Sequence, residues 1–207
     1  MVKVKEMPYI EKYNEILGMF KILESFAPQL VKEELGVEKL NELQNIWKQE
    51  TAPITKDASD KEKYDVAHRN FIHNWVSANN IMIKYQKEVG AKKFMHAAIA
   101  GWNQKYVNQA LILKTMRSIS SKTAFKRLAN RLAYQLQAFS PFSVTELTDK
   151  HMILTIAPCK ILETQEGNNF CSKACQNIIP SWLEKQFNIK MNLNRQGANC
   201  LATIEPF

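Results

Sequence analysis

The sequence predicts an α+β fold, in which a helical N-terminal layer packs on a small antiparallel β-β-α-β-β sheet unit. Two observations support this prediction. Apolar residues recur every three or four positions through the first two thirds of the chain, as in amphipathic helices. After Ser140-Pro141 the pattern changes to short runs rich in Val, Ile and Thr that are separated by turns. We therefore expect a helical layer over residues 1–139 and a cysteine-bearing unit over residues 140–207, integrated in one domain.

Five helices are expected in the N-terminal layer. Each begins or ends at a residue that favours a helix boundary, such as a capping Ser or Asp, a Pro or a Gly. The expected helices are residues 13–28 (ending near Pro28), 37–47, one from Ser59 or Asp60 to Gly90, 91–118 and 123–139.

Two hairpins and one helix are expected in the C-terminal unit. The alternating segments FSVTELTD and MILTIAP are joined by a turn at Asp149-Lys150, and NIKMNLN and NCLATIEP by a turn at residues 195–197. A helix is expected between them, over residues 169–182. The expected core positions of the first hairpin are Val144, Ile153 and Ile156.

The net charge of +8 originates in one acid-free segment, residues 89–145. Nine of the 28 Lys and Arg residues lie there, which leaves 19 basic against 20 acidic residues in the rest of the chain. A segment of one sign indicates an anionic partner, such as an acidic protein or a membrane surface, although acids from the N-terminal helices could equally balance it. Nucleic acid is the weaker alternative because charge alone supports it. The residues expected to contact the partner are Lys122, Lys126, Arg127 and Arg131.

All four cysteines of the chain, Cys159, Cys171, Cys175 and Cys200, lie in the last 49 residues. We expect a cytoplasmic protein, because the N-terminus has no secretory h-region and no segment is long and apolar enough to span a membrane. Reduced thiols then favour a metal site over disulfides. Cys171 and Cys175 are one helical turn apart, and the other two cysteines can meet them if the hairpins pair. A helix N-terminus would also favour their thiolate form.

The cysteine spacing does not select one metal. It is neither the Cys-x2-Cys pair of zinc ribbons nor a ferredoxin run, so zinc and an iron–sulfur cluster both stay open. Four thiolates would close a zinc site, which favours a structural role. The same cysteines could instead be buried structural thiols, or one of them could act as a redox or nucleophilic group.

Aromatic residues recur along the third expected helix and the one after it. His68, Trp75, Tyr85 and Trp102 could line a ligand pocket, with His68 holding a ligand. The alternative is a packed core in which a carbonyl or a Tyr hydroxyl satisfies the imidazole. No Gly-rich phosphate loop, Ser nucleophile elbow or His-Glu-x-x-His motif occurs in the sequence. Whether the protein catalyses a reaction is therefore left open.

The segments CKILE, FCSKAC and NRQGANCLATIE, together with the α-then-ββαββ order, resemble the C-terminus of the 4-vinyl-reductase domain family. Relatives that resemble 2-aminothiazoline-carboxylate hydrolases share these features. Gly197 and Cys200 match the family's terminal glycine-then-cysteine turn, whereas its glutamate and cysteine before that turn are absent, with residues 191–194 in their place. The resemblance implies a ligand pocket between helices and sheet, with C-terminal cysteines binding zinc beside it.

These features predict a non-enzymatic ligand-binding or assembly protein with a zinc site. Its ligand would be apolar or tetrapyrrole-like, since the resembling family occurs in sensor modules and in tetrapyrrole and photosynthetic contexts. The alternative is a hydrolase or reductase with a catalytic cysteine, metal or iron–sulfur site. A homodimer is also left open.

Overall fold

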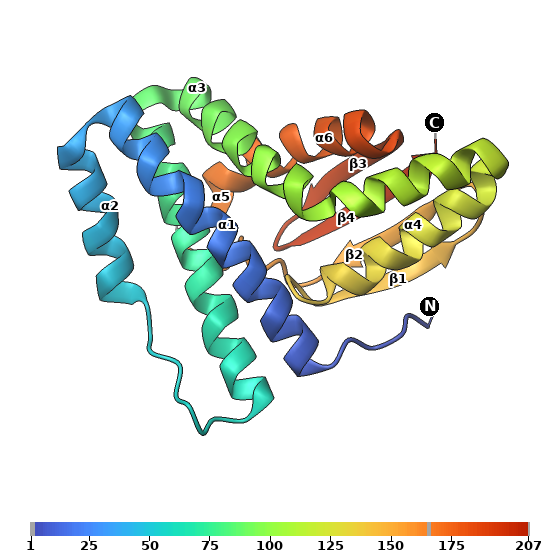
Figure 1. The fold of residues 1–207 in the computed structure, drawn as a ribbon, viewed down its shortest axis with the longest axis horizontal. Coiled ribbons are helices and arrows are strands. Elements are labelled where there is room, and N and C mark those ends of the chain that lie inside the picture. The colour runs from blue at the N-terminus through green and yellow to red at the C-terminus, as the bar shows by residue number, and fades with distance from the viewer. Residues whose placement is uncertain (1–2, 165–166, 207) are drawn as a thin grey trace.

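The computed structural model describes residues 3–164 and 167–206, leaving out the side chains at positions 109, 110, 113, 114, 116–119 and 121. The predicted α+β fold is confirmed, with helices first and a four-stranded antiparallel sheet in the C-terminal part (Figure 1). The helices are α1 (Tyr9–Leu35), α2 (Val37–Glu50), α3 (Asp60–Ile119), α4 (Ser121–Leu136), α5 (Gly167–Phe170) and α6 (Ile178–Phe187). The strands are β1 (Phe142–Leu147), β2 (Met152–Ile156), β3 (Ile189–Gln196) and β4 (Asn199–Pro206).

Helix α1 continues past the proline that was expected to end it. Pro28 lies inside the helix, and Ala27 and Val31 on either side of it are fully buried. Proline removes one backbone N–H donor from a helix. Here the apolar burial of the flanking residues outweighs that loss, so the helix extends to Leu35.

Helix α3 begins at a reciprocal cap. The Ser59 N–H donates to the Glu62 carboxylate at 2.8 Å, and the Glu62 N–H donates to Ser59 Oγ at 3.3 Å. The helix does not stop at Gly90 as expected. It bends at Lys87, where φ is 54° and ψ is −131°. We refer to residues 60–86 as the first arm of α3 and to residues 88–119 as the second arm.

The two predicted hairpins form and then pair with each other, which gives the strand order β1-β2-β4-β3. Leu154 of β2 stands opposite Val144 of β1 and Ala202 of β4, and all three are buried. The expectation that Ile153 is a core residue is wrong, because successive strand residues face opposite sides of a sheet and its neighbours Met152 and Leu154 take the buried side. The last turn is shifted by one residue from its expected position. Gly197, with φ of 65°, is the first residue of a two-residue loop between β3 and β4.

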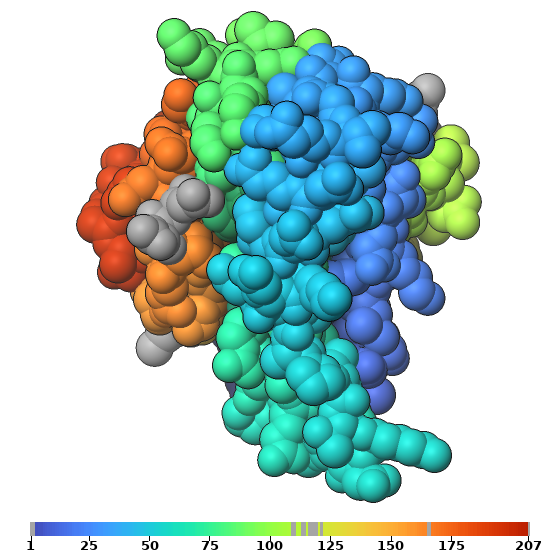
Figure 2. Space-filling model, turned by 90° about the vertical axis from the view of Figure 1, so that its left-hand side faces the viewer, coloured from blue at the N-terminus to red at the C-terminus, as the bar shows by residue number. Residues whose placement is uncertain are grey.

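Two hydrophobic cores hold the fold together, and each takes side chains from both parts of the chain. The first lies among α1, α2 and the arms of α3, and it also includes Phe170 and Ala174. The second lies on the sheet and includes Phe125 and Leu128 of α4. In Figure 2 the C-terminal residues lie along the flank of the helices, and α2 covers the helical side. None of the helices in the described part of the chain could cross a membrane.

Candidate metal centre

Two of the four cysteines meet at one end of the sheet. Cys200 lies near the start of β4, opposite Ile156 at the end of β2. Cys159 follows β2 by three residues, and its backbone N–H donates to the carbonyl of Ala198 at 3.0 Å. Because β2 and β4 are antiparallel neighbours, the exit of β2 and the entry of β4 lie side by side.

The other two cysteines begin and end a short π-helical turn, η1 (Cys171–Cys175), between α5 and α6. The N–H of Gln176 donates to the carbonyl of Cys171 at 3.1 Å, the fifth residue back. The continuous α-helix expected over residues 169–182 is therefore interrupted. Phe170 and Ala174 anchor the turn in the first core, where both are buried. Turns of this kind often mark functional sites.

The thiols of the four cysteines interact electrostatically. Burial raises the pKa of Cys175 well above its ordinary value, and negative charge on Cys171, Cys159 or Cys200 raises it further. Burial also raises the pKa of Cys200 to about 11, with added repulsion from Cys171 and Cys159. All four cysteines are free thiols. Segments that are distant in the sequence thus bring their thiols within electrostatic range of one another.

The expected preference for thiolate at a helix N-terminus does not hold. The pKa of Cys171 is raised, first by burial and then by Cys159, although the Arg195 guanidinium lowers it in part. Helix α5 has only four residues, so its dipole is small beside the cost of removing a charged sulfur from water. The raised pKa values therefore favour the protonated form of Cys171, Cys175 and Cys200 at neutral pH unless a cation offsets the cost.

The four thiols match a soft-metal ligand set in chemistry but do not yet form a ligand shell. In the part of the chain that the structure describes, no three His, Cys, Asp or Glu side chains stand in position to hold a metal ion. Zinc and iron–sulfur clusters both bind thiolates, and four such ligands complete either site. Binding would require the sulfurs to converge by side-chain rotation from their present neighbouring positions.

Sequence reasoning missed Arg195 as a residue of this centre. Arg195 is opposite Cys200 in the β3–β4 pair, and its Nε donates to the carbonyl of Gly197 at 2.9 Å. Four thiolates carry more negative charge than one divalent cation neutralises, so a nearby guanidinium would favour the loaded site. The available signal is the position of Arg195 just before the Gly197–Cys200 turn, where sequence reasoning considers only the glycine and the cysteine.

Trp75 and Trp102, two of the residues expected to line a ligand pocket, pack against each other. Their rings stack with centroids 5.6 Å apart and an interplanar angle of 7°, and both residues are buried. His68 is also buried, and its Nε2 lies 2.7 Å from the carbonyl oxygen of Phe139, a distance that makes it the donor. Burial lowers the pKa of His68, so the neutral imidazole is favoured. His68 is therefore a core histidine satisfied by a carbonyl, the alternative that the sequence left open.

Tyr85, the fourth expected pocket residue, does not join the other three. It is 40% exposed, and its hydroxyl donates to the Glu42 carboxylate at 3.1 Å. It therefore lies at the surface between α3 and α2. The rings that surround Trp75 belong to Phe26, Phe71, Phe94 and Phe170.

The expected basic residues of α4 lie on its exposed face. Lys122 forms an ion pair with Asp149 at 3.2 Å, and Lys126, Arg127 and Arg131 are exposed. Elsewhere in the acid-free segment, acids of α1 neutralise two lysines, as the sequence allowed. Lys93 pairs with Glu34, and Lys105 pairs with Glu15 at 2.7 Å.

Comparisons with protein-family models, with curated proteins and with solved structures give no match to this chain.

Proposed function

We propose that this chain is a non-enzymatic metal-binding protein in which Cys159, Cys171, Cys175 and Cys200 hold one zinc ion. The observation that supports the proposal is that four buried or half-buried thiols from separate segments lie close enough to interact electrostatically. The ion would connect the end of the sheet to the π-helical turn that is anchored in the helical core.

A cation would reverse the interactions that now raise the pKa values of the thiols. Without it, burial and mutual repulsion both disfavour thiolate at Cys175. With it, each thiolate gains a strong attraction, and the protons leave as the metal binds. Metal affinity is therefore expected to increase with pH. With four thiolates no coordination position stays open for a water or a substrate, so zinc would have a structural role.

The raised pKa values of Cys171, Cys175 and Cys200 argue against any of these three acting as a free nucleophile, because thiolate is the reactive form. Ligand binding in the aromatic layer has less support than the metal site. An apolar or tetrapyrrole-like ligand would have to part the stacked rings of Trp75 and Trp102. We therefore favour the metal site as the functional centre of the chain.

Metal analysis of anaerobically purified protein tests the proposal. We expect about one zinc per chain, and loss of zinc in each of the single variants Cys159→Ser, Cys171→Ser, Cys175→Ser and Cys200→Ser, because a structural zinc site uses four ligands. Ser172→Ala is the matched control, since Ser172 lies between two of the cysteines and its hydroxyl contacts only backbone carbonyls of Asn168 and Asn169.

Two other results would change the assignment. A brown sample with broad visible absorption would mean that the same four cysteines bind an iron–sulfur cluster and not zinc. Metal that is retained in all four Cys→Ser variants would refute the site.

A further inference from the structure

We infer that the hairpin made by the second arm of α3 and by α4 docks on an anionic lipid membrane surface. The occupant would be the phospholipid headgroup layer, which Lys and Arg side chains contact while aliphatic side chains enter its apolar boundary. The inference concerns a surface apart from the cysteines, so it stands whether or not the metal site is correct.

The first observation is an exposed aliphatic group on the second arm. Val107 is 47% exposed, Leu111 is 58% exposed and Ile112 is 49% exposed. Val107 and Leu111 are four residues apart, which places them one above the other on the same face of the helix. Gln104 and Asn108 lie on the same turns and are uncharged and exposed. This stretch of the second arm therefore presents three aliphatic side chains to water.

The second observation is the excess of positive charge beside that face. Residues 89–145 contain nine Lys and Arg residues and no Asp or Glu. Three of the nine are paired with acids from other segments, in Lys93–Glu34, Lys105–Glu15 and Lys122–Asp149. Lys126 and Arg131 are exposed on α4 and take part in no ion pair found among the described residues.

The aliphatic and basic side chains belong to two helices that follow one another in the chain and pack together. Helix α4 turns Phe125 and Leu128 to the core on the sheet, and the second arm turns Trp102 to Trp182 of α6. Both helices thus bury one side against the C-terminal unit, and Figure 1 shows α4 running back beside the second arm of α3.

The combination of charges and aliphatic groups favours a membrane over other polyanions. Nucleic acid would use the basic residues but gain little from exposed Leu, Val and Ile. Some helices have basic residues and an aliphatic face but too few apolar residues to cross a bilayer. Such a helix lies in the membrane interface, where anionic lipid attracts each Lys or Arg. No acid in the segment opposes that attraction.

Co-sedimentation with phospholipid vesicles tests the inference. The full chain should bind vesicles of phosphatidylcholine that contain about a third of phosphatidylserine, and should not bind vesicles of phosphatidylcholine alone. Lys126→Glu should weaken binding by about fivefold or more, the effect expected for removal of one basic contact. Leu111→Glu should weaken it by about tenfold, since it removes an aliphatic side chain that would enter the apolar boundary of the membrane and adds a charge that anionic lipid repels.

Two matched controls test whether position matters. Lys56→Glu makes the same charge change on the exposed segment between α2 and α3, and Val37→Glu places an acid at a 57% exposed valine on α2. Neither should alter binding by more than about twofold, because both lie away from the hairpin. Failure to bind the phosphatidylserine vesicles at low salt would overturn the inference. So would equal losses in the control and hairpin variants, which would mean that net charge alone is responsible.

Discussion

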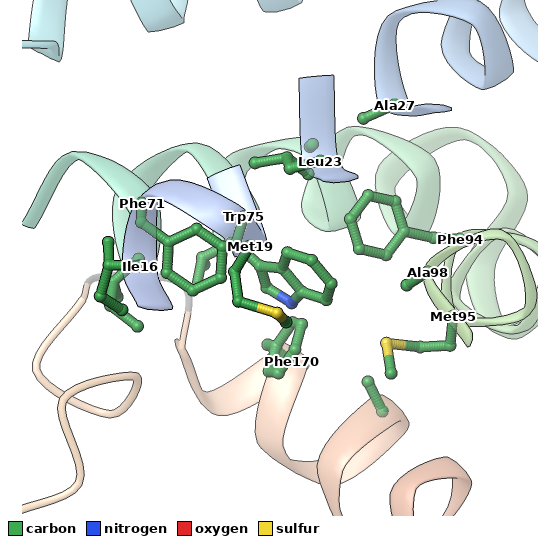
Figure 3. Packing of buried hydrophobic residues seen from close by; sticks show 14 of the residues in the cluster. Ile16, Met19, Leu23, Ala27, Phe71, Trp75, Phe94, Met95, Ala98 and Phe170 are labelled. Carbon is green, nitrogen blue, oxygen red and sulfur yellow. The ribbon is translucent and has the colours of Figure 1, made fainter. Parts of the chain in front are cut away.

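The aromatic core around Trp75 and the cysteine centre at the end of the sheet differ in whether the chain itself supplies favourable partners for their side chains. Figure 3 shows Trp75 enclosed by side chains from three parts of the chain, with Phe94 and Met95 from the second arm of α3 on one side and Phe170 from the C-terminal unit below it. Aromatic partners that the protein itself supplies surround that indole ring.

In the cysteine centre the thiols are close to one another, but no interaction between them is attractive. The negative charge of neighbouring thiolates raises the pKa values of Cys175 and Cys200, and burial, which removes the water that would stabilise the charge, raises them more. Apolar packing is thus complete within the chain, whereas the thiols would gain their full interaction energy only from a cation. This difference predicts that the two centres respond to different perturbations.

The largest change in stability is expected from a substitution in the aromatic core. Phe94 is fully buried and its ring contacts those of Phe26 and Trp75. Phe94→Ala should lower the free energy of unfolding by about 3–5 kcal/mol, because it removes a large buried side chain and leaves a cavity. Urea denaturation measures this change, and its size should be the same with or without a chelator. Val89→Ala, at a 57% exposed residue, is the control and should change stability by less than about 0.5 kcal/mol.

The next effect is removal of metal from the cysteine centre. A chelator should destabilise the native chain by several kcal/mol, on the order expected when metal binding contributes to folding. The same chelator should leave Cys200→Ser unchanged, because that variant would lack the proposed ion. Thermal unfolding of both proteins, with and without chelator, checks the prediction. Losses of about 1 kcal/mol that are additive over the cysteines and insensitive to chelator would indicate ordinary buried thiols instead.

A smaller effect is expected at the bend between the two arms of α3, where a substitution should raise the free energy of unfolding. Lys87 has φ of 54° and ψ of −131°, a conformation that side chains disfavour and glycine tolerates. Lys87→Gly should stabilise the protein by about 1 kcal/mol through relief of strain. Lys92→Gly, in the helical part of the second arm, should destabilise it by about 1 kcal/mol. Destabilisation by both variants in urea denaturation would contradict strain at the bend.

The smallest effect is a pH dependence from His68 at the edge of the aromatic core. Burial lowers the pKa of this imidazole from its ordinary value of 6.5, so the folded state disfavours the charged form. Its contribution to stability is therefore present above about pH 6.5 and is lost as the pH falls through the folded-state pKa. His68→Gln keeps a donor for the carbonyl of Phe139 but cannot titrate, so its stability should depend less on pH. Denaturation at about pH 7.5 and 5.5 measures the difference, with His96→Gln, at an exposed residue, as the surface control.

Local patterns were sufficient to predict most of the elements. The spacing of apolar residues indicated the helices, and alternation with turn residues indicated both hairpins, because these signals come from neighbours in the sequence. The predictions failed where distant residues decided the outcome. Pro28 lies within a helix because Ala27 and Val31 pack in the core, and the π-helical turn interrupts the expected helix while Phe170 and Ala174 are held in the first core.

The candidate site shows the same division. The sequence by itself determined that four cysteines crowd the C-terminal end and that one segment carries the positive charge, since both are properties of composition and order. Only the tertiary structure decided that β2 lies beside β4, which brings Cys159 to Cys200, and that Arg195 stands by them. It also decided that Trp75 and Trp102 stack while Tyr85 is left at the surface. Such pairings depend on how separate elements pack in space, and packing is a property of the whole chain rather than of any local pattern.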